Sequence, residues 1–201
     1  MTFANQTIDE FLGNVASDNI TPSGGAVAAI SGAAGAALCE MVCIHTLRQT
    51  ADPDVEQELT TIRAESSAYR QRLVELADED SAAVNELQSA FNSPHIEHHD
   101  EEMQKAMKRA TNAPLKTAEA CLEVIELAIT ASELCNQNAI ADVGTGASLA
   151  YGSLRASVLT VQFNLQMIDD ETYVDEVSVR TDHLKDSAER KVAAVAESVN
   201  S

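Results

Sequence analysis

The sequence predicts an all-α protein, a single-domain helical bundle of about six helices that spans residues 1–201. Two observations predict this class. Apolar residues recur at intervals of three and four in long segments, which is the period of a helix with one buried face. No segment alternates apolar and polar residues between turn signals, as a half-buried strand would. A chain of this length buries roughly 70% of its unfolded surface, so its core needs neither disulfides nor a structural metal.

The chain is strongly acidic. It holds 32 Asp and Glu against 13 Lys and Arg, for a formal net charge of -19, while 45% of its residues are apolar. This charge opposes binding to nucleic acid and to an anionic membrane, because both need a basic surface. Acidic surfaces repel one another in dilute buffer and are screened in molar salt. The N-terminal residues show no secretory signal. We therefore expect a cytoplasmic protein of a halophile that neither binds nucleic acid nor enters a membrane.

The first two predicted helices are separated by a turn. Apolar residues at three-four spacing predict a short helix over 5–18, and the segment 21–25 (TPSGG) breaks it. The segment 25–50 is small or apolar on nearly every side, which predicts a helix buried on nearly every side. Glu40, His45 and the missing aromatic belt favour the central helix of a bundle over a membrane span.

A third helix is predicted over 54–92, a run without Gly or Pro. Its buried stripe is mostly aliphatic and aromatic, but Asp80 occupies a position where the pattern predicts leucine. A buried carboxylate loses its hydration, which raises its pKa unless cations or hydrogen-bond donors compensate. Enzymes use such a group as a general acid or base near neutral pH. The alternative is a core aspartate whose bonds to neighbouring groups are purely structural.

Three more helices are predicted, over about 100–136, 139–168 and 171–199. Pro114 inside the first of them should kink or interrupt it. The second is again small and apolar, and the last is charged and amphipathic. Two helices this apolar carry more apolar surface than one bundle of this size can bury. We therefore expect a helix-packed homodimer.

Further polar residues stand at positions where they need partners. Asp142 lies near the start of the helix over 139–168 and is either a cap or a site residue. Asn164 is an amide inside that helix, and it must find a partner on another helix or on a polar ligand. Pro22, Ser23, Gly24 and Gly25 form a turn at the start of a predicted helix. This turn is either an anion-binding site, because the N–H groups at a helix start are free, or a plain turn.

No metal site is expected. The four cysteines are predicted to be buried free thiols, because the chain has a large core and no export signal. A site formed by Cys39, Cys43 and His45 is disfavoured, because His45 points to another side of the helix. A cluster of loop histidines lacks the fourth ligand that zinc needs, and its members are His95, His98 and His99.

Four segments in order resemble the cyclodeaminase/cyclohydrolase family. They are TPSGGAVAAISGAAGAALCEMV, LADEDSAAV, KRATNAPLKTAE, and NQNAIADVGTGA followed by TVQFNLQMIDD. Together they extend over nearly the whole chain. The family includes formiminotetrahydrofolate cyclodeaminase and a methenyltetrahydrofolate cyclohydrolase. The resemblance implies an all-helical dimer with folate sites in clefts.

The resemblance also implies roles for individual residues. It makes Asp80 the catalytic aspartate, with a substrate-binding set of Pro22, Ser23, Gly24, Gly25, Asn136, Asp142 and Asn164. Four cations are candidates for contacts with the glutamate carboxylates of a folate, and the alternative for each is an ordinary surface charge: Arg48, Lys105, Lys108 and Arg109. The chain departs from the usual family pattern at four positions, which leaves the substrate preference open. Ser23 replaces Gly, Ala26 and Ala141 each replace Ser, and Thr160 replaces Asn.

The first functional expectation is the cyclising deamination of 5-formiminotetrahydrofolate to 5,10-methenyltetrahydrofolate and ammonia. Asp80 would act as general acid and base on the folate substrate, without a bound cofactor. The alternative is a cyclohydrolase that converts 5,10-methenyltetrahydrofolate to 10-formyltetrahydrofolate, which fits a chain without the formiminotransferase domain of larger relatives. A non-catalytic helical scaffold or folate carrier is a second alternative. Asp80 opposes it, because a scaffold gains nothing from a carboxylate on its core stripe.

Overall fold

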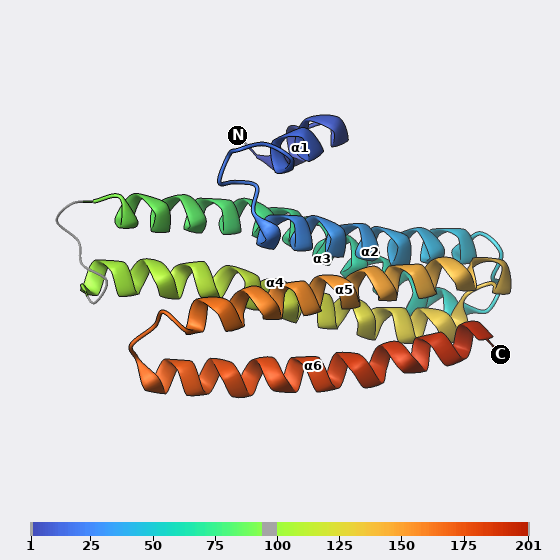
Figure 1. Cartoon of the computed structure of the whole chain (residues 1–201). Coiled ribbons are helices and arrows are strands. Elements are labelled where there is room, and N and C mark those ends of the chain that lie inside the picture. Colours follow the sequence, from blue (N-terminus) through green and yellow to red (C-terminus); the bar gives the residue numbers. More distant parts are fainter. Residues whose placement is uncertain (1, 94–99, 201) are drawn as a thin grey trace.

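The computed structural model of the chain describes residues 2–93 and 100–200. These residues form six α-helices and two short 3-10 helices, with no strand in either range (Figure 1). The all-α prediction is therefore confirmed. The elements in chain order are η1 (Phe3–Asn5), α1 (Ile8–Val15), α2 (Gly24–Leu47), α3 (Pro53–Phe91), α4 (Glu101–Leu134), η2 (Gln137–Ala139), α5 (Ile140–Leu165) and α6 (Glu171–Asn200).

Local capping signals define the helix starts. At α1, the Thr7 side chain accepts from the Glu10 N–H at 3.2 Å, and the Glu10 carboxylate accepts from the Thr7 N–H at 2.8 Å. At α3, Asp52 is the N-cap and Pro53 lies in the first turn. The bounds of the five long helices differ from the predicted ones by three residues or fewer. Only α1 is clearly shorter than predicted, because residues 3–5 form a separate 3-10 turn.

The helix that packs on all four other long helices is α4, not α2 as predicted. The most apolar helix, α2, is buried over only half of its most apolar stretch, so the predicted burial on nearly every side is not met within one chain. This helix contacts α3, α4 and α5, whereas α6 covers α4 and α5 from the other side (Figure 1). With a mean hydropathy of 1.9, α2 is long and apolar enough to cross a membrane, yet half of that stretch is buried by its neighbours. A core helix passes the same test, and the packing of α2 on three helices is typical of one.

Glycines allow α2 to approach its neighbours closely. A β-carbon built on Gly35 would stand 2.6 Å from the carbonyl oxygen of Gly146 in α5, and one on Gly146 would stand 2.9 Å from that of Gly35. A β-carbon on Gly32 would stand 2.7 Å from the Sγ atom of Cys121 in α4. The backbones of α2 and α5 therefore touch where the two helices cross.

The helix α4 continues through Pro114 from Glu101 to Leu134, so the interruption we considered from the sequence does not occur. Proline has no N–H to donate to the carbonyl of Ala110, four residues earlier. The Nδ2 group of Asn164 in α5 donates to that carbonyl at 3.0 Å instead. A neighbouring helix thus replaces the donor that the proline removes.

All four cysteines are buried free thiols, as predicted. Burial raises the pKa of Cys39 to about 12 and that of Cys43 to about 11, so both stay protonated at neutral pH. His45 is exposed and does not join these buried thiols. Across 2–93 and 100–200, no three His, Cys, Asp or Glu side chains gather as metal ligands would. The predicted histidine cluster lies outside the described residues, since it consists of His95, His98 and His99.

Candidate active site

Asp80 lies where α3 passes the start of α2. Its exposed fraction is 2%, and it shares the buried face of α3 with Leu73, Leu76 and Ala77. The helix α2 begins about midway along the bundle (Figure 1). The predicted burial of a carboxylate on the core stripe is therefore confirmed.

Two hydrogen-bond donors from the start of α2 reach this carboxylate. The Oγ atom of Ser23 donates to Oδ2 of Asp80 at 2.6 Å, and the backbone N–H of Ala26 donates to the same carboxylate. The first four N–H groups of a helix have no partner within the helix, and the helix dipole makes that end positive. The Ser23 side chain makes no capping bond to its own helix. Asp80, from another helix, thus supplies the anion that an N-cap side chain normally provides.

Gly25 makes this contact possible. A β-carbon built on Gly25 would stand 2.2 Å from Oδ1 and 2.6 Å from Cγ of Asp80, closer than real β-carbons come to other atoms. Gly24 differs, because it is exposed and its β-carbon position has nothing within 4 Å. Of the two glycines in the predicted turn, Gly25 leaves no room for a side chain beside the carboxylate, whereas Gly24 faces outward.

The pKa of Asp80 lies above its ordinary value of 3.8. Burial is the main cause, because it removes water from the charged form. The bonds from Ser23 and Ala26 favour the charged form and lower the pKa, but they do not outweigh burial. The side chain can therefore take up and release a proton closer to neutral pH than an exposed aspartate, as acid-base catalysis requires.

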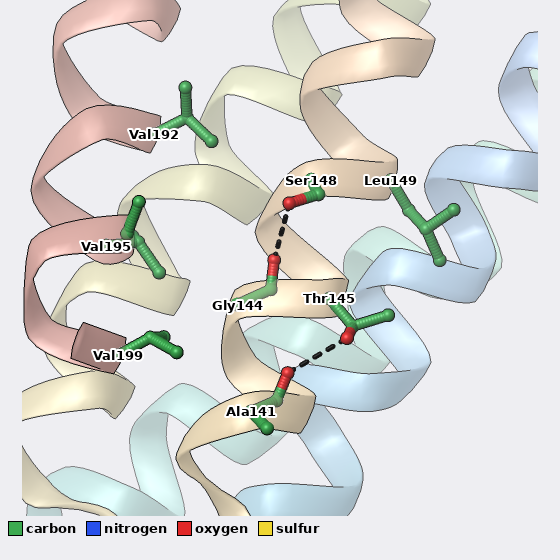
Figure 2. A pocket seen from close by; sticks show the side chains of 9 residues that line it. Ala141, Gly144, Thr145, Ser148, Leu149, Val192, Val195 and Val199 are labelled. Carbon is green, nitrogen blue, oxygen red and sulfur yellow. Dashed lines mark hydrogen bonds between the residues drawn. The ribbon is translucent and has the colours of Figure 1, made fainter.

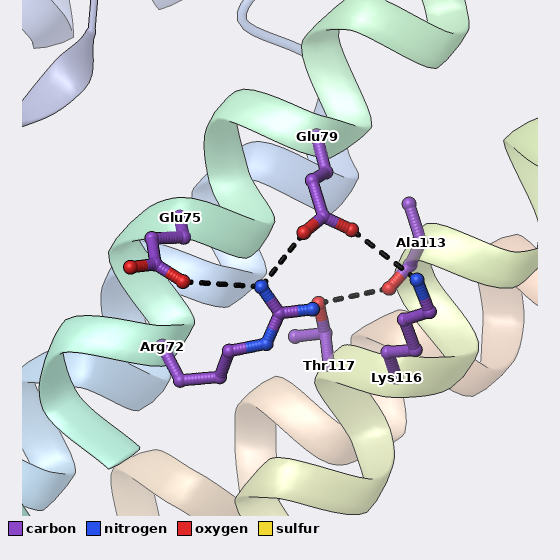
Figure 3. Close-up of polar contacts among 6 residues, drawn as sticks. All are labelled: Arg72, Glu75, Glu79, Ala113, Lys116 and Thr117. Atoms are coloured by element: carbon purple, nitrogen blue, oxygen red, sulfur yellow. Dashed lines mark hydrogen bonds and ion pairs between the residues drawn. The ribbon is translucent and has the colours of Figure 1, made fainter. Parts of the chain in front are cut away.

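The adjacent carboxylate, Glu79, has the opposite shift. Burial raises its pKa, but hydrogen bonds and charges from Arg72 and Lys116 outweigh burial, so the pKa stays below 4.5. Figure 3 shows Glu79 between these two cations. Nη1 of Arg72 donates to Oε1 of Glu79 at 2.7 Å, and Nζ of Lys116 donates to Oε2 at 3.4 Å. Because Arg72 lies on α3 and Lys116 on α4, the network ties these helices together.

Three predicted site residues lie away from the start of α2. Arg48 and Asn136 lie at its other end, and Asp142 lies one helical turn before Gly146, which touches the middle of α2 at Gly35. The 24 residues of α2 at about 1.5 Å each separate its two ends by ~36 Å. Arg48 follows the last residue of α2, and the backbone N–H of Asn136 is bound there by the Thr46 hydroxyl at 3.3 Å. Asp142 lies in the first turn of α5. Within one chain, the structure thus brings the turn 22–25 to Asp80 but separates both from these three residues.

Asn164 is the remaining member of the predicted substrate-binding set. Its exposed fraction is 9%, and its amide nitrogen is already bound to the Ala110 carbonyl. Of the two roles that the sequence left open for this amide, cross-linking of helices is therefore confirmed. A contact with substrate stays a prediction.

The predicted glutamate-binding cations on α4 have different surroundings. Lys108 forms an ion pair with Asp170 at 2.6 Å, and Arg109 forms one with Glu86 at 2.6 Å. Lys105 is exposed. Because two of these cations already have carboxylate partners on their own chain, a folate tail would have to displace those partners to bind them.

A surface groove of about 470 Å³ lies between α5 and α6 (Figure 2). Its wall is mainly apolar, with valines of α6 facing α5. Its two hydroxyls donate to carbonyls of their own helix, Thr145 to Ala141 at 2.9 Å and Ser148 to Gly144 at 2.8 Å. The groove does not include Asp80, so it is not the candidate active site.

Sequence reasoning missed two contacts that help to place the turn and the N-terminus against α3. Asn85 donates through Nδ2 to Oγ1 of Thr21 at 3.4 Å, and the Phe3 N–H donates to Asp78 at 2.9 Å. The partners are 64 and 75 residues apart. No local pattern signals a bond across such separations.

Comparisons with known proteins agree with this architecture. Residues 7–183 match the family model described as Formiminotransferase-cyclodeaminase. The methenyltetrahydrofolate cyclohydrolase of Methylorubrum extorquens is 37% identical over 179 residues, which cover 86% of this chain and 85% of that protein. The formimidoyltransferase-cyclodeaminase of Sus scrofa is 24% identical over 92% of this chain, which spans only 35% of that larger protein. The crystal structure of formiminotetrahydrofolate cyclodeaminase from Thermotoga maritima matches with a TM-score of 0.92 and 26% identity, covering 98% of this chain and 97% of that one.

Proposed function

The chain belongs to the formiminotransferase-cyclodeaminase family, and we propose that it is an enzyme that hydrolyses 5,10-methenyltetrahydrofolate to 10-formyltetrahydrofolate. A relative that is 37% identical over most of both chains is named for this activity. The structural observation that supports the proposal is the buried carboxylate of Asp80 at the start of α2, with its raised pKa. It is the group that the chemistry needs.

The reaction needs one group that takes a proton and returns it. Water adds to the carbon that joins N5 and N10 of the cationic substrate, and ionised Asp80 takes a proton from this water as the C–O bond forms. The bond from the tetrahedral carbon to N5 then breaks, and Asp80 returns its proton to N5. The second proton of the water leaves to solvent as the formyl group forms on N10. These steps use no bound cofactor.

Cyclising deamination is the second candidate. The observation that favours it is the TM-score of 0.92 with the formiminotetrahydrofolate cyclodeaminase of Thermotoga maritima. In that reaction N10 attacks the carbon of the protonated amidine (amidinium) on N5, and Asp80 takes the N10 proton. Asp80 then returns this proton to the NH2 group on the tetrahedral carbon, which leaves as ammonia. A tetrahedral carbon between N5 and N10 forms in both reactions, so one carboxylate can serve either of them.

We also propose that the chain forms a homodimer through the outer face of α2 and α5. On α5, Leu149, Leu159 and Phe163 have exposed fractions of 37%, 68% and 64%. This face carries few charges, and chains of net charge -19 repel least where acidic groups are sparse. Two adjacent helices about 36 Å long present roughly 700 Å², close to the ~800 Å² per partner of a standard interface.

An antiparallel pairing of this face would reunite the two separated groups of predicted substrate residues. The start of α2 in one protomer would lie beside the end of α2 in its partner, an orientation that the helix dipoles favour. The turn 22–25 and Asp80 of one protomer would then face Arg48 of the partner subunit, Asn136 of the partner subunit and Asp142 of the partner subunit. Each folate would be bound by residues of both chains.

The function is tested by following the loss of the near-ultraviolet absorbance of 5,10-methenyltetrahydrofolate in molar potassium chloride. We expect wild type to accelerate the decay and Asp80→Asn to slow it by at least roughly 100-fold, as for a lost acid-base group. Glu79→Gln is the matched control, because it removes the adjacent carboxylate, and it should keep most of the rate. Ammonia release from 5-formiminotetrahydrofolate is measured with the same proteins. Ammonia release without methenyl hydrolysis would reassign the enzyme to deamination, and the lack of both would contradict either reaction.

The antiparallel dimer is tested by cysteine cross-linking with a short bis-maleimide. Gly24→Cys combined with Arg48→Cys should give a covalent dimer, because the two positions meet only between chains. Each single variant, and Gly24→Cys combined with Arg190→Cys on α6, should remain monomeric on a denaturing gel. A dimer from Gly24→Cys alone would indicate a parallel pairing. No dimer from the double variant would contradict the proposed interface.

A further inference from the structure

Ser23 occupies the N-cap position of α2, but its side chain makes no capping hydrogen bond to that helix. It precedes α2 with extended backbone angles, φ -88° and ψ 179°, as an N-cap residue does. An N-cap side chain normally accepts a hydrogen bond from an N–H of its own first turn. The Ser23 hydroxyl instead donates to Oδ2 of Asp80, 57 residues away, at 2.6 Å. Its bonding partner is therefore the candidate catalytic group.

We infer that Ser23 is a positioning residue that orients the Asp80 carboxylate and sets the pH range in which it exchanges protons. This inference rests on the proposed function, in which Asp80 must take a proton and return it. A hydroxyl donor stabilises the ionised carboxylate, whereas burial destabilises it. Ser23 therefore keeps a 2% exposed carboxylate available in its ionised form, as a base needs.

Other charged groups near Asp80 are directed elsewhere. On α3, Asp78 binds the Phe3 N–H and Glu79 binds Arg72. On α4, Arg109 pairs with Glu86 and Lys116 pairs with Glu79. The first charged residue of α2 is Glu40, far along the helix, and it pairs with Arg70. In α5, the charged residue that precedes Asn164 most closely along the chain is Arg155, and its guanidinium lies over the ring of Tyr151. Ser23 and the Ala26 N–H are thus the groups that favour the ionised form of Asp80.

The neighbouring residue Ala26 indicates that the hydroxyl can be supplied from a second position. Ser23 and Ala26 are one helical turn apart, and both contribute a donor to Asp80. A serine at position 26 would place its hydroxyl beside the carboxylate that its own N–H already binds.

The experiment measures the pKa of Asp80 directly, by carboxyl NMR of ¹³C-labelled protein without substrate, and the pH profile of kcat/KM. Ser23→Ala should raise the pKa and move the acid limb of the profile upward by roughly one pH unit, the equivalent of one lost hydrogen bond. Ser23→Thr should keep wild-type values, because it retains the hydroxyl. Adding Ala26→Ser to Ser23→Gly should restore them. Ser31→Ala is the matched control, because the Ser31 hydroxyl donates only to Val27 of its own helix at 2.8 Å.

The outcomes separate this inference from the proposed function. A pKa of Asp80 that does not move in Ser23→Ala, or that moves equally in Ser31→Ala, would overturn it. The NMR titration does not depend on turnover. If the protein has no hydrolase activity, the proposed function is wrong, but the titration still shows whether Ser23 changes the pKa of Asp80. If Ser23→Ala does not fold, the comparison of Ser23→Gly/Ala26→Ser with Ser23→Gly decides whether a hydroxyl is needed.

Discussion

The Cα atom of Gly25 lies so close to the carboxylate of Asp80 that an added β-carbon would stand 2.2 Å from Oδ1. Gly25→Ala should therefore displace the carboxylate or the start of α2. We expect turnover to fall by roughly 100-fold, as for a misplaced catalytic group, and the free energy of unfolding to fall by about 1–3 kcal/mol. Gly13→Ala is the control, because its β-carbon position has nothing within 4 Å. Urea unfolding and the absorbance assay measure both effects, and wild-type turnover in Gly25→Ala would contradict the close contact.

The raised pKa of Asp80 makes stability depend on pH in a definite direction. Its pKa in the folded state lies above the ordinary value of 3.8, so the folded state binds the proton more tightly than the unfolded state. The stabilisation from this proton is complete below pH 3.8 and is lost as the pH rises through the folded-state pKa. Relative to Asp80→Asn, which does not titrate, wild type should therefore lose stability from about pH 4 upward. Urea unfolding of both proteins at one protein concentration tests this. The prediction is contradicted if the stability of wild type relative to Asp80→Asn stays constant or increases as the pH rises.

The bond from Asn164 to the carbonyl of Ala110 can be tested by a double-mutant cycle. Asn164→Ala should lower the free energy of unfolding by about 1–3 kcal/mol, because it leaves a buried carbonyl without a donor. Pro114→Ala returns an N–H to the position that normally serves this carbonyl. Asn164→Ala should then cost less in the Pro114→Ala background, with a coupling on the order of 1 kcal/mol. Simple additivity of the two changes would mean that the amide does not compensate for the proline.

The acidity of the chain predicts a dependence of stability on salt. With a net charge of -19, repulsion within the folded chain should weaken as potassium chloride rises from dilute to molar concentration. We expect the free energy of unfolding to increase over this range. The control is a variant of α6 with four exposed carboxylates made neutral, which should depend less on salt: Asp175→Asn, Glu176→Gln, Asp186→Asn and Glu189→Gln. Equal salt dependence in both proteins would contradict charge repulsion as the cause.

Most of the fold follows from local patterns in the sequence. Three-four spacing and breaking residues locate the five long helices, and a polar residue on an apolar stripe identifies Asp80. Side-chain partners are not local, so the bond from Ser23 to Asp80 could not be predicted. Nor could the pairs that Lys108 and Arg109 form with Asp170 and Glu86.

The separation of Asn136 and Asp142 from Asp80 within one chain can be predicted by counting residues along the helices. In an antiparallel bundle, the α2–α3 and α4–α5 connections lie at the same end. Asp80 is 27 residues beyond Pro53, far enough along α3 to return to the start of α2. Grouping residues by motif alone ignores this direction, so it does not reveal that these residues lie apart within one chain.

The contact between Gly35 and Gly146 limits the mutational tolerance of the chain. None of the described glycines has a positive φ angle, so none is required for an unusual backbone conformation. Their tolerance is decided by the space around each of them. Gly13, Gly24 and Gly152 have room for a side chain, whereas at Gly35 and Gly146 even a methyl group meets the opposing backbone. A library of variants selected for folding would therefore accumulate changes at the first three positions and keep glycine at the crossing of α2 and α5.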